Sequence, residues 1–178
     1  MATKYAMDVP KDPRSYIPSS QWSNSTSFAA VTLKDGINYL FYYDRGNHLA
    51  CLAGKDADSY NNRTVRLNGS TIQAGEKSPL AATAWEDRNG SPEAIRLYYI
   101  DTSSSQIKEL VSENGGESWK EGAFNRQKYH IARSGGLAAS SSPGGGLKVY
   151  FADPDNDDSI VEASIGTVSS DWELNVIQ

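Results

Sequence analysis

A pattern of short strands recurs three times along this sequence of 178 residues. Each copy opens with a pair of alanines in one strand, and an aspartate ends the next strand. The alanine pairs begin at Ala29, Ala81 and Ala138, and the aspartates are Asp44, Asp101 and Asp153. Each set is spaced by steps of 52 and 57 residues. A unit of four short strands in about 40–50 residues is typical of β-propeller blades. The sequence therefore predicts an all-β, propeller-like protein built from three four-stranded repeats.

The second copy shows the strand pattern most clearly. Residues 95–101 alternate in the direction of their side chains and are rich in aromatic and β-branched residues, as a half-buried strand is. A small, polar turn follows, and residues 106–111 resume the alternation as a second strand. If the two strands pair as a hairpin, Arg96 and Glu109 come close enough to share one polar ligand.

The predicted propeller-like domain covers residues 22–178 and follows an irregular arm, residues 1–21, with three prolines. Its repeats are expected at about residues 26–77, 78–134 and 135–178, and their closing strands at residues 64–67, 129–132 and 172–177. Three blades do not close a ring, because closed propellers have about four to eight. We therefore expect a homodimer that makes six blades about a twofold axis. The alternative is that the arm supplies strands for a fourth blade.

The second copy reads IRLYY at residues 95–99, then IKE at residues 107–109, and then Trp119. This order resembles the fungal fucose-specific lectin family, in which each blade carries I-R-V-Y-Y, then I-x-E, then a tryptophan. The fold of that family is a six-bladed propeller, so the resemblance implies the same fold here. The likeness is close over residues 80–120 and covers residues 26–177 as a pattern.

The other two copies match this motif less completely. The third copy reads LKVYF at residues 147–151, then IVE at residues 160–162, and then Trp172. In the first copy, Tyr39 replaces the arginine and Cys51 replaces the glutamate. The resemblance therefore implies no fucose site in the first copy.

The resemblance implies a carbohydrate-binding lectin that recognises fucose or a fucosylated glycan between neighbouring blades, without catalysis. The ligand-binding residues that it implies are Arg96, Glu109 and Trp119 in the second copy, and Lys148, Glu162 and Trp172 in the third. A neutral sugar needs a few placed donors and acceptors beside an aromatic surface, which is what these residue types offer. Lys148 offers a point charge and not a planar fork. Two other interpretations stay open: cross-strand ion pairs of little energetic value, and tryptophans that only pack blades together.

Composition excludes several other functions. The formal net charge is −5, which argues against non-specific nucleic-acid binding, since that needs a basic face. No apolar run approaches the roughly 20 residues of a membrane-spanning helix, and the first residues contain no apolar signal segment. We therefore expect a protein that is cytoplasmic, or exported without a classical signal peptide. Cys51 is the single cysteine, and His48 and His130 lie in different copies, so the sequence predicts no metal site and no cofactor.

Two competing functions remain open from the sequence. One is a protein-interaction scaffold with degraded sugar sites, which the departures in the first copy favour. The other is a sialidase-like glycoside hydrolase, because residues 112–119 fit the S-x-D-x-G-x-x-W box of sialidase-like propellers, with Asn114 in place of the aspartate. That box is usually a folding device at a hairpin turn, and nothing in the sequence groups the three arginines that a sialidase needs. We therefore predict that the protein is not an enzyme.

Overall fold

The computed structural model describes residues 27–75, 78–85, 93–132, 135–142, 146–156, 159–166 and 171–177. The predicted arm, residues 1–21, lies outside these ranges, and so do the strands that it would supply for a fourth blade in the alternative arrangement. No helix in the described ranges is long and apolar enough to cross a membrane.

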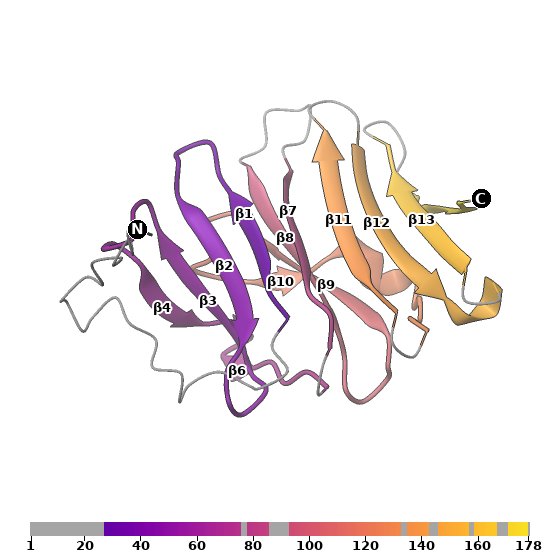
Figure 1. Cartoon of the computed structure of the whole chain (residues 1–178), viewed down its shortest axis with the longest axis horizontal. Helices are drawn as coiled ribbons and strands as arrows, with labels where there is room; N and C mark the ends of the chain where they lie inside the picture. Colours follow the sequence, from indigo (N-terminus) through magenta and orange to yellow (C-terminus); the bar gives the residue numbers. More distant parts are fainter. Residues whose placement is uncertain are drawn as a thin grey trace, which may run out of the picture.

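Three antiparallel sheets of four strands follow one another along the chain, and we name them blades 1, 2 and 3. Blade 1 contains β1 (Ala29–Thr32), β2 (Asn38–Tyr43), β3 (Leu49–Gly54) and β4 (Asn61–Thr64). Blade 2 contains β7 (Ala81–Trp85), β8 (Ala94–Ile100), β9 (Ile107–Ser112) and β10 (Lys120–Glu121). Blade 3 contains β11 (Leu137–Ser142), β12 (Gly146–Asp153), β13 (Ser159–Ile165) and β14 (Glu173–Val176). Figure 1 shows the blades side by side in chain order. The prediction of an all-β protein with three four-stranded repeats is confirmed.

The closing strands of the first two repeats were predicted in the wrong places. The fourth strand of blade 1 is β4, whereas β5 (Arg66–Leu67) pairs with β6 (Ser70–Thr71) in a separate hairpin. The fourth strand of blade 2 is β10, and His130 makes only an isolated bridge to Gln106. Strands β4 and β10 are exposed along their whole length, so they carry polar residues and show no hydrophobic alternation. In blade 3, β14 falls within the predicted residues 172–177.

Two short 3₁₀-helices complete the described elements. The first, η2 (Ala123–Arg126), follows β10, and the second, η3 (Pro154–Asn156), follows β12. Phe124 of η2 is fully buried in the core that contains Tyr98 of blade 2 and Trp172 of blade 3, and it anchors this turn there.

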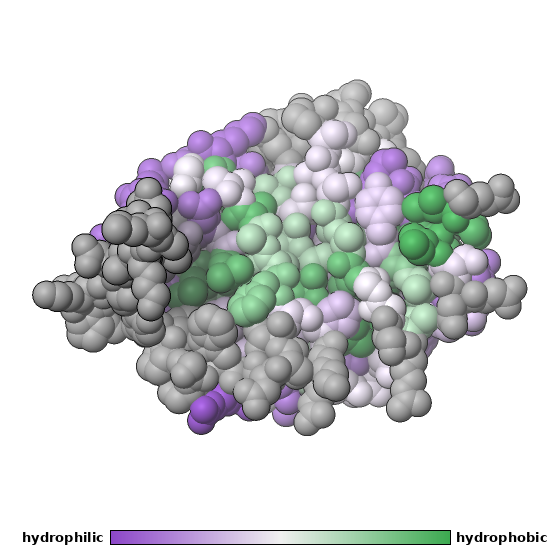
Figure 2. All heavy atoms as spheres, viewed as in Figure 1, coloured by the Kyte–Doolittle hydropathy of each residue, from purple (hydrophilic) through white to green (hydrophobic). Residues whose placement is uncertain are grey.

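The first strands of the blades lie against one another, with β7 in contact with both β1 and β11. The band of weakly hydrophobic side chains that crosses the middle of Figure 2 lies over these strands. The small alanines of the repeat suit this crowded position, and Ala29 and Ala81 are buried there. A contact of 2.9 Å between Thr83 Oγ1 and Ser141 Oγ joins β7 to β11. The alanine pairs therefore mark the strands at which the blades converge.

Two hydrophobic cores hold the blades together, one between each pair of neighbours. Phe41 of blade 1 and Trp119 of blade 2 meet in the first core, with ring centroids 5.7 Å apart and planes at 81°. Phe124 and Trp172 meet in the second core, with centroids 4.8 Å apart and planes at 86°. Fully burying one large apolar side chain contributes about 1.5–3 kcal/mol, so the blades are stacked mainly by these aromatic and aliphatic contacts.

Candidate functional site

The register of blade 2 places three polar side chains on one face of the sheet. Residues paired across antiparallel strands point to the same face, as do residues two apart along a strand. Arg96 pairs with Val111, and Tyr98 pairs with Glu109, so Arg96, Tyr98 and Glu109 share a face. Tyr98 belongs to the core that blade 2 forms with blade 3. This face therefore points toward blade 3.

Arg96 and Glu109 form an ion pair inside the protein. Arg96 Nη1 donates to Glu109 Oε1 at 2.8 Å, and the two side chains are 16% and 0% exposed. Tyr98 donates its hydroxyl to the same oxygen at 2.9 Å, and the backbone N–H of Phe124 donates to Oε2 at 3.1 Å. Both carboxylate oxygens are thus occupied, which a buried charge requires if it is not to destabilise the fold. The pairing that the hairpin predicted is present.

The surroundings of Glu109 hold its carboxylate in place. Asn125 accepts a hydrogen bond from the Glu109 backbone N–H at 2.6 Å and donates to its carbonyl at 3.2 Å. The carboxylate packs directly over Gly122, where a Cβ atom would overlap it. Burial, and after it the negative charge of Glu109, raises the pKa of the Tyr98 hydroxyl well above its ordinary value. Tyr98 therefore remains a hydrogen-bond donor at any physiological pH.

Three N–H groups at this interface have no acceptor among the described residues. They are Arg96 Nε, Trp85 Nε1 and Trp172 Nε1, and all three are buried. The Trp85 ring lies over the Arg96 guanidinium, 4.7 Å from its central carbon to the ring centroid. Buried donors are nearly always paired in folded proteins, so each of these three calls for an explanation. The interface between blades 2 and 3 therefore contains three buried donors that lack acceptors, beside the Arg96–Glu109 pair.

The structure places the two predicted tryptophans at different interfaces. Trp119 belongs to the core between blades 1 and 2, where it packs on Phe41. It therefore lies on the face of blade 2 opposite to Arg96 and Glu109. Trp172 of blade 3 belongs to the same core as Tyr98 and is 8% exposed. The structure thus separates Trp119 from the ion pair and brings Trp172 to the interface that contains it.

The grouping of residues by copy could not show this arrangement, because it depends on contacts between copies. Trp85 was also not among the predicted ligand-binding residues. Trp85 follows Thr83 by two residues in the sequence. In the sheet, Thr83 pairs with Arg96 across strands β7 and β8. Trp85 and Arg96 therefore share a face of blade 2.

The second predicted pair, Lys148 and Glu162, is also formed. Lys148 Nζ donates to Glu162 Oε2 at 2.9 Å, and the side chains are 44% and 19% exposed. The hydrogen bond from Lys148 lowers the pKa of Glu162, and the same bond raises the pKa of Lys148. In the register of blade 3, Lys148 lies opposite Ser164, two residues from Glu162, so Lys148 and Glu162 share a face. Their neighbours Leu147 and Val149 point the other way, into the core with blade 2, so the Lys148–Glu162 pair faces away from blade 2. No other blade of the described chain covers that face.

In blade 1 the equivalent positions are occupied without an ion pair. Phe41 pairs with Cys51 as Tyr98 pairs with Glu109, and Tyr39 takes the place of Arg96. Burial raises the pKa of the Cys51 thiol to about 12. The first interface therefore has an apolar centre. A hollow of about 380 Å³ lies beside it, lined in part by Tyr39, Arg63 and Glu93.

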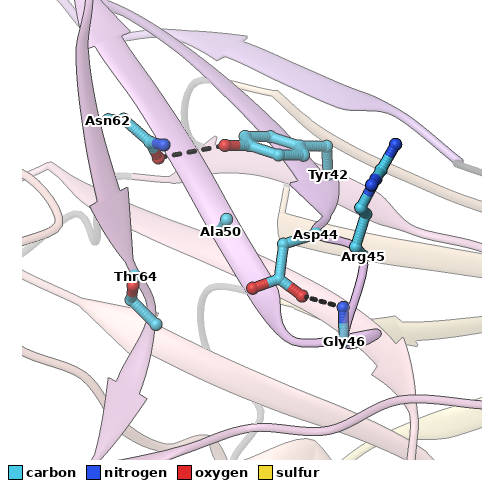
Figure 3. A pocket seen from close by; sticks show the side chains of 7 residues that line it. All are labelled: Tyr42, Asp44, Arg45, Gly46, Ala50, Asn62 and Thr64. Carbon is cyan, nitrogen blue, oxygen red and sulfur yellow. Dashed lines mark hydrogen bonds between the residues drawn. The ribbon is translucent and has the colours of Figure 1, made fainter. Parts of the chain in front are cut away.

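A second hollow, of about 250 Å³, lies on the face of blade 1 that points away from blade 2 (Figure 3). It is lined by Tyr42, Asp44, Arg45, Gly46, Ala50, Asn62 and Thr64. The Tyr42 hydroxyl donates to Asn62 Oδ1 at 3.0 Å, and the Asp44 carboxylate accepts the Gly46 N–H at 2.8 Å. Figure 3 shows both bonds along the wall of the hollow. No feature of the sequence pointed to this place.

The box at residues 112–119 acts as a folding device. Ser112 Oγ accepts the Gly116 N–H at 2.8 Å, and Asn114 Oδ1 accepts the Ser118 N–H at 3.0 Å. These bonds close the turn between β9 and β10. Nowhere in the described ranges do three or more His, Cys, Asp or Glu residues gather in a way that could hold a metal ion.

Comparison with known proteins shows what this chain is similar to. No protein-family profile matches it. A curated protein named fucose-specific lectin, from Arthroderma benhamiae, is 36% identical over 66 residues, which are 36% of this chain and 18% of that protein. The matched region thus spans under a fifth of this relative.

Solved structures of lectins share the fold. The Aleuria aurantia lectin, described as a six-bladed β-propeller, has a TM-score of 0.69 at 18% identity, over 88% of this chain and 50% of that chain. The lectin AofleA from Arthrobotrys oligospora has a TM-score of 0.68 at 20% identity, over 88% of this chain and 43% of that chain. A fucose lectin from Kordia zhangzhouensis has a TM-score of 0.58 at 20% identity, over 85% of this chain and 99% of that chain.

These comparisons agree with the motifs in the sequence. The chain spans about half the length of the first two of these structures and nearly all of the third. The resemblance to the fungal fucose-specific lectins is confirmed, and the three blades of this chain have the β-propeller fold of those lectins.

Proposed function

We propose that this protein is a lectin that binds fucose or a fucosylated glycan, without catalysis, between blades 2 and 3. The observation that carries the proposal is the meeting of the Arg96–Glu109 pair with three N–H donors that lack acceptors. A sugar supplies the missing acceptors through its hydroxyl and ring oxygens. Support also comes from the relative named fucose-specific lectin, and from solved lectins whose structures hold α-methyl fucoside.

The interface offers a sugar both of the surfaces that it needs. Arg96 and Glu109 provide a charged donor and a charged acceptor, which form stronger hydrogen bonds than neutral groups do. Trp85 and Trp172 provide rings for the less polar face of a pyranose and its C–H groups. Low exposure of the pair strengthens each polar contact, because little water competes for it.

Catalysis is not expected at this site. Glycoside hydrolysis by paired carboxylates needs one group that delivers a proton and a second that acts as base or nucleophile, about 5–10 Å apart. Glu109 is held as an acceptor on both of its oxygens. It therefore suits the recognition of a hydroxyl group better than the donation of a proton.

We also propose that two copies assemble into a ring of six blades. The described chain has three blades and aligns with 50% of a solved six-bladed chain. Twofold dimers are the commonest closed oligomers, and they would place blade 1 of each copy beside blade 3 of the other. Several sites in one assembly would increase avidity for clustered glycans.

A second candidate function is an interaction scaffold with degraded sugar sites. The first interface favours it, because Tyr39 and Cys51 stand there at the positions equivalent to Arg96 and Glu109. Neither residue offers the charged group that would hold a sugar. The scaffold needs neither Arg96 nor the unpaired donors, so sugar titration separates the two functions.

Calorimetric titration with methyl α-L-fucoside tests the proposed function. Saturable binding is expected for the wild type, and Arg96→Lys keeps the charge but loses the planar fork. Hydrogen bonds to charged groups contribute about 1.5–3 kcal/mol, so we expect a loss of about 10–100-fold in affinity. Lys55→Ala, on an exposed turn after β3 of blade 1, is the control and is expected to bind as the wild type does. A folded wild type that does not bind at millimolar fucoside would contradict the proposal.

A further inference from the structure

The hollow of about 380 Å³ beside the first interface is lined by residues of both blade 1 and blade 2. Blade 1 contributes the turn before β2 and side chains of β2 and β4, and blade 2 contributes the segments before β8 and β10. Pockets that bind small molecules have volumes of about 300–1,000 Å³. The hollow is therefore large enough for a small organic ligand.

Negative charge dominates the lining of this hollow. Three carboxylates and one guanidinium give it a formal charge of −2, and they belong to Asp35, Glu93, Glu117 and Arg63. The backbone N–H of Lys34 donates to Glu93 Oε2 at 2.7 Å. The backbone N–H of Ile37 donates to Asp35 Oδ1 at 2.9 Å. The backbone thus holds two of the carboxylates at the hollow, and a recess lined by one sign of charge attracts ligands of the opposite sign.

The hydroxyl of Tyr39 is a buried polar group at the same hollow. This residue is 3% exposed, and its hydroxyl makes no hydrogen bond with any described residue. A Cβ atom at Gly115 would stand 2.9 Å from the hydroxyl oxygen, and Gly115 lines the hollow, so the hydroxyl points into it. Burial raises the pKa of Tyr39, and the charges of Asp35 and Glu117 raise it further. Because buried polar groups are nearly always hydrogen-bonded, this hydroxyl points to a ligand.

Neither a metal ion nor a neutral sugar suits these groups. Within the ranges that the structure describes, no three His, Cys, Asp or Glu side chains gather closely enough to hold a metal ion. A neutral sugar would find Tyr39 and Cys51 where the second interface has Arg96 and Glu109. A ligand that matches the hollow therefore carries positive charge and is longer than a single ion.

We propose that this hollow binds a small aliphatic amine in its protonated form, at a site separate from the proposed sugar site. An ammonium group has three N–H donors and no acceptor. One N–H donates to the Tyr39 hydroxyl, and the others donate to the carboxylates of Asp35 and Glu117. The methylene chain of the amine packs on Leu33 and Ile37, which line the hollow and pack in the first core.

An amine fits the hollow better than an anion or a zwitterion does. Arg63 carries the one guanidinium of the described lining, and its Nη1 donates to the Gly115 carbonyl at 3.4 Å. A carboxylate bound to Arg63 would also face three carboxylates of the protein, which repel it. Asp35 and Glu117 are exposed, so water and salt screen their charges, and we expect an affinity in the millimolar range.

Titration with putrescine, a short aliphatic diamine, tests the site through ¹H–¹⁵N correlation spectra. We expect saturable shifts for the wild type at a constant ionic strength of about 0.15 M. Tyr39→Phe should bind at least about tenfold more weakly, because a hydrogen bond to a charged group is lost. Urea denaturation should show no loss of stability in Tyr39→Phe, since the hydroxyl makes no hydrogen bond with the described residues.

A pair of charge variants tests the role of the carboxylates. Glu117→Gln removes one negative charge from the lining and should weaken putrescine binding about two- to fivefold, as expected for an exposed ion pair. Glu173→Gln removes the same charge from an exposed position on β14 of blade 3, outside the hollow. This matched control should bind putrescine as the wild type does, which separates the site from the effect of net charge.

Three results would overturn the inference. The first is a wild type whose spectra show no saturable shifts at millimolar putrescine, and the second is equal affinity in Tyr39→Phe and the wild type. The third is equally tight binding of the neutral diol of the same chain length, because the site would then not recognise an ammonium group. Methyl α-L-fucoside should bind Tyr39→Phe as it binds the wild type, so the amine site and the proposed function can fail independently.

Discussion

Arg96 Nη1 lies 2.8 Å from Glu109 Oε1 on the face of blade 2 that meets blade 3, and the Glu109 side chain is fully buried. The pair is held by a tyrosine hydroxyl and by a backbone N–H, and a tryptophan ring covers the guanidinium. A surface ion pair would contribute little to stability. This one is costly to bury, and both carboxylate oxygens of Glu109 accept hydrogen bonds, so the carboxylate is fixed in position.

Glu109→Gln should be strongly destabilising, since it leaves the Arg96 charge buried without its partner. Removal of one member of a buried ion pair costs about 3–5 kcal/mol of unfolding free energy. Urea denaturation followed by circular dichroism measures the change. The matched control is Glu162→Gln, whose pair is partly exposed and should cost much less unfolding free energy. Equal costs for the two variants would contradict the buried role of Glu109.

Gly122→Ala should displace the Glu109 carboxylate. The added Cβ atom would overlap the carboxylate, and overpacking of this kind costs about 1–3 kcal/mol. Weaker fucoside binding should accompany the lower stability, because the acceptor moves. Gly136→Ala is the control, since no atom lies within 4 Å of a Cβ at that position. Unchanged stability and binding in Gly122→Ala would show that the carboxylate is free to move.

The Lys148–Glu162 pair should appear in the pH dependence of stability. The pKa of Glu162 is lowered in the folded protein by its hydrogen bond with Lys148. A lowered folded pKa means that the stabilisation is present above the ordinary pKa of glutamate, and is lost as the pH falls through the folded value. Carboxyl NMR titration should give a Glu162 pKa below its ordinary value, and Lys148→Ala should raise it. A Glu162 pKa that Lys148→Ala leaves unchanged would exclude the pair in solution.

Cys51 should be unreactive in the native protein. The side chain is 4% exposed, and burial raises the pKa of the thiol to about 12, so almost no thiolate is present at pH 8. A chromogenic disulfide reagent should label it only after unfolding in urea. Rapid labelling of the native protein at pH 8 would show that the first interface opens.

The hairpin that brings Arg96 to Glu109 was predictable, because only 13 residues separate them and strand alternation fixes their face. The threefold repeat was predictable for the same reason, since each blade is built from neighbouring segments. The fourth strands β4 and β10 were not, because edge strands exposed along their length carry no hydrophobic pattern.

The tryptophan that lies beside the Arg96–Glu109 pair was harder to predict than the pair itself. Trp119 follows Glu109 in the sequence, but the two lie on opposite faces of blade 2. Trp172 reaches the interface from the next blade, and that contact depends on how the blades stack. Periodicity within one strand contains no information on such contacts between repeats.

The indole N–H signals of the tryptophans test the central claim most directly. The chain has four tryptophans, and single Trp→Phe variants assign their resonances in a ¹H–¹⁵N correlation spectrum. On titration with methyl α-L-fucoside, the Trp85 and Trp172 signals should shift, because their N–H groups lack acceptors at the interface of blades 2 and 3. The Trp119 signal should stay in place, since that ring packs at the other interface. A shift of Trp119 alone, or no shift at saturating fucoside, would contradict a sugar site between blades 2 and 3.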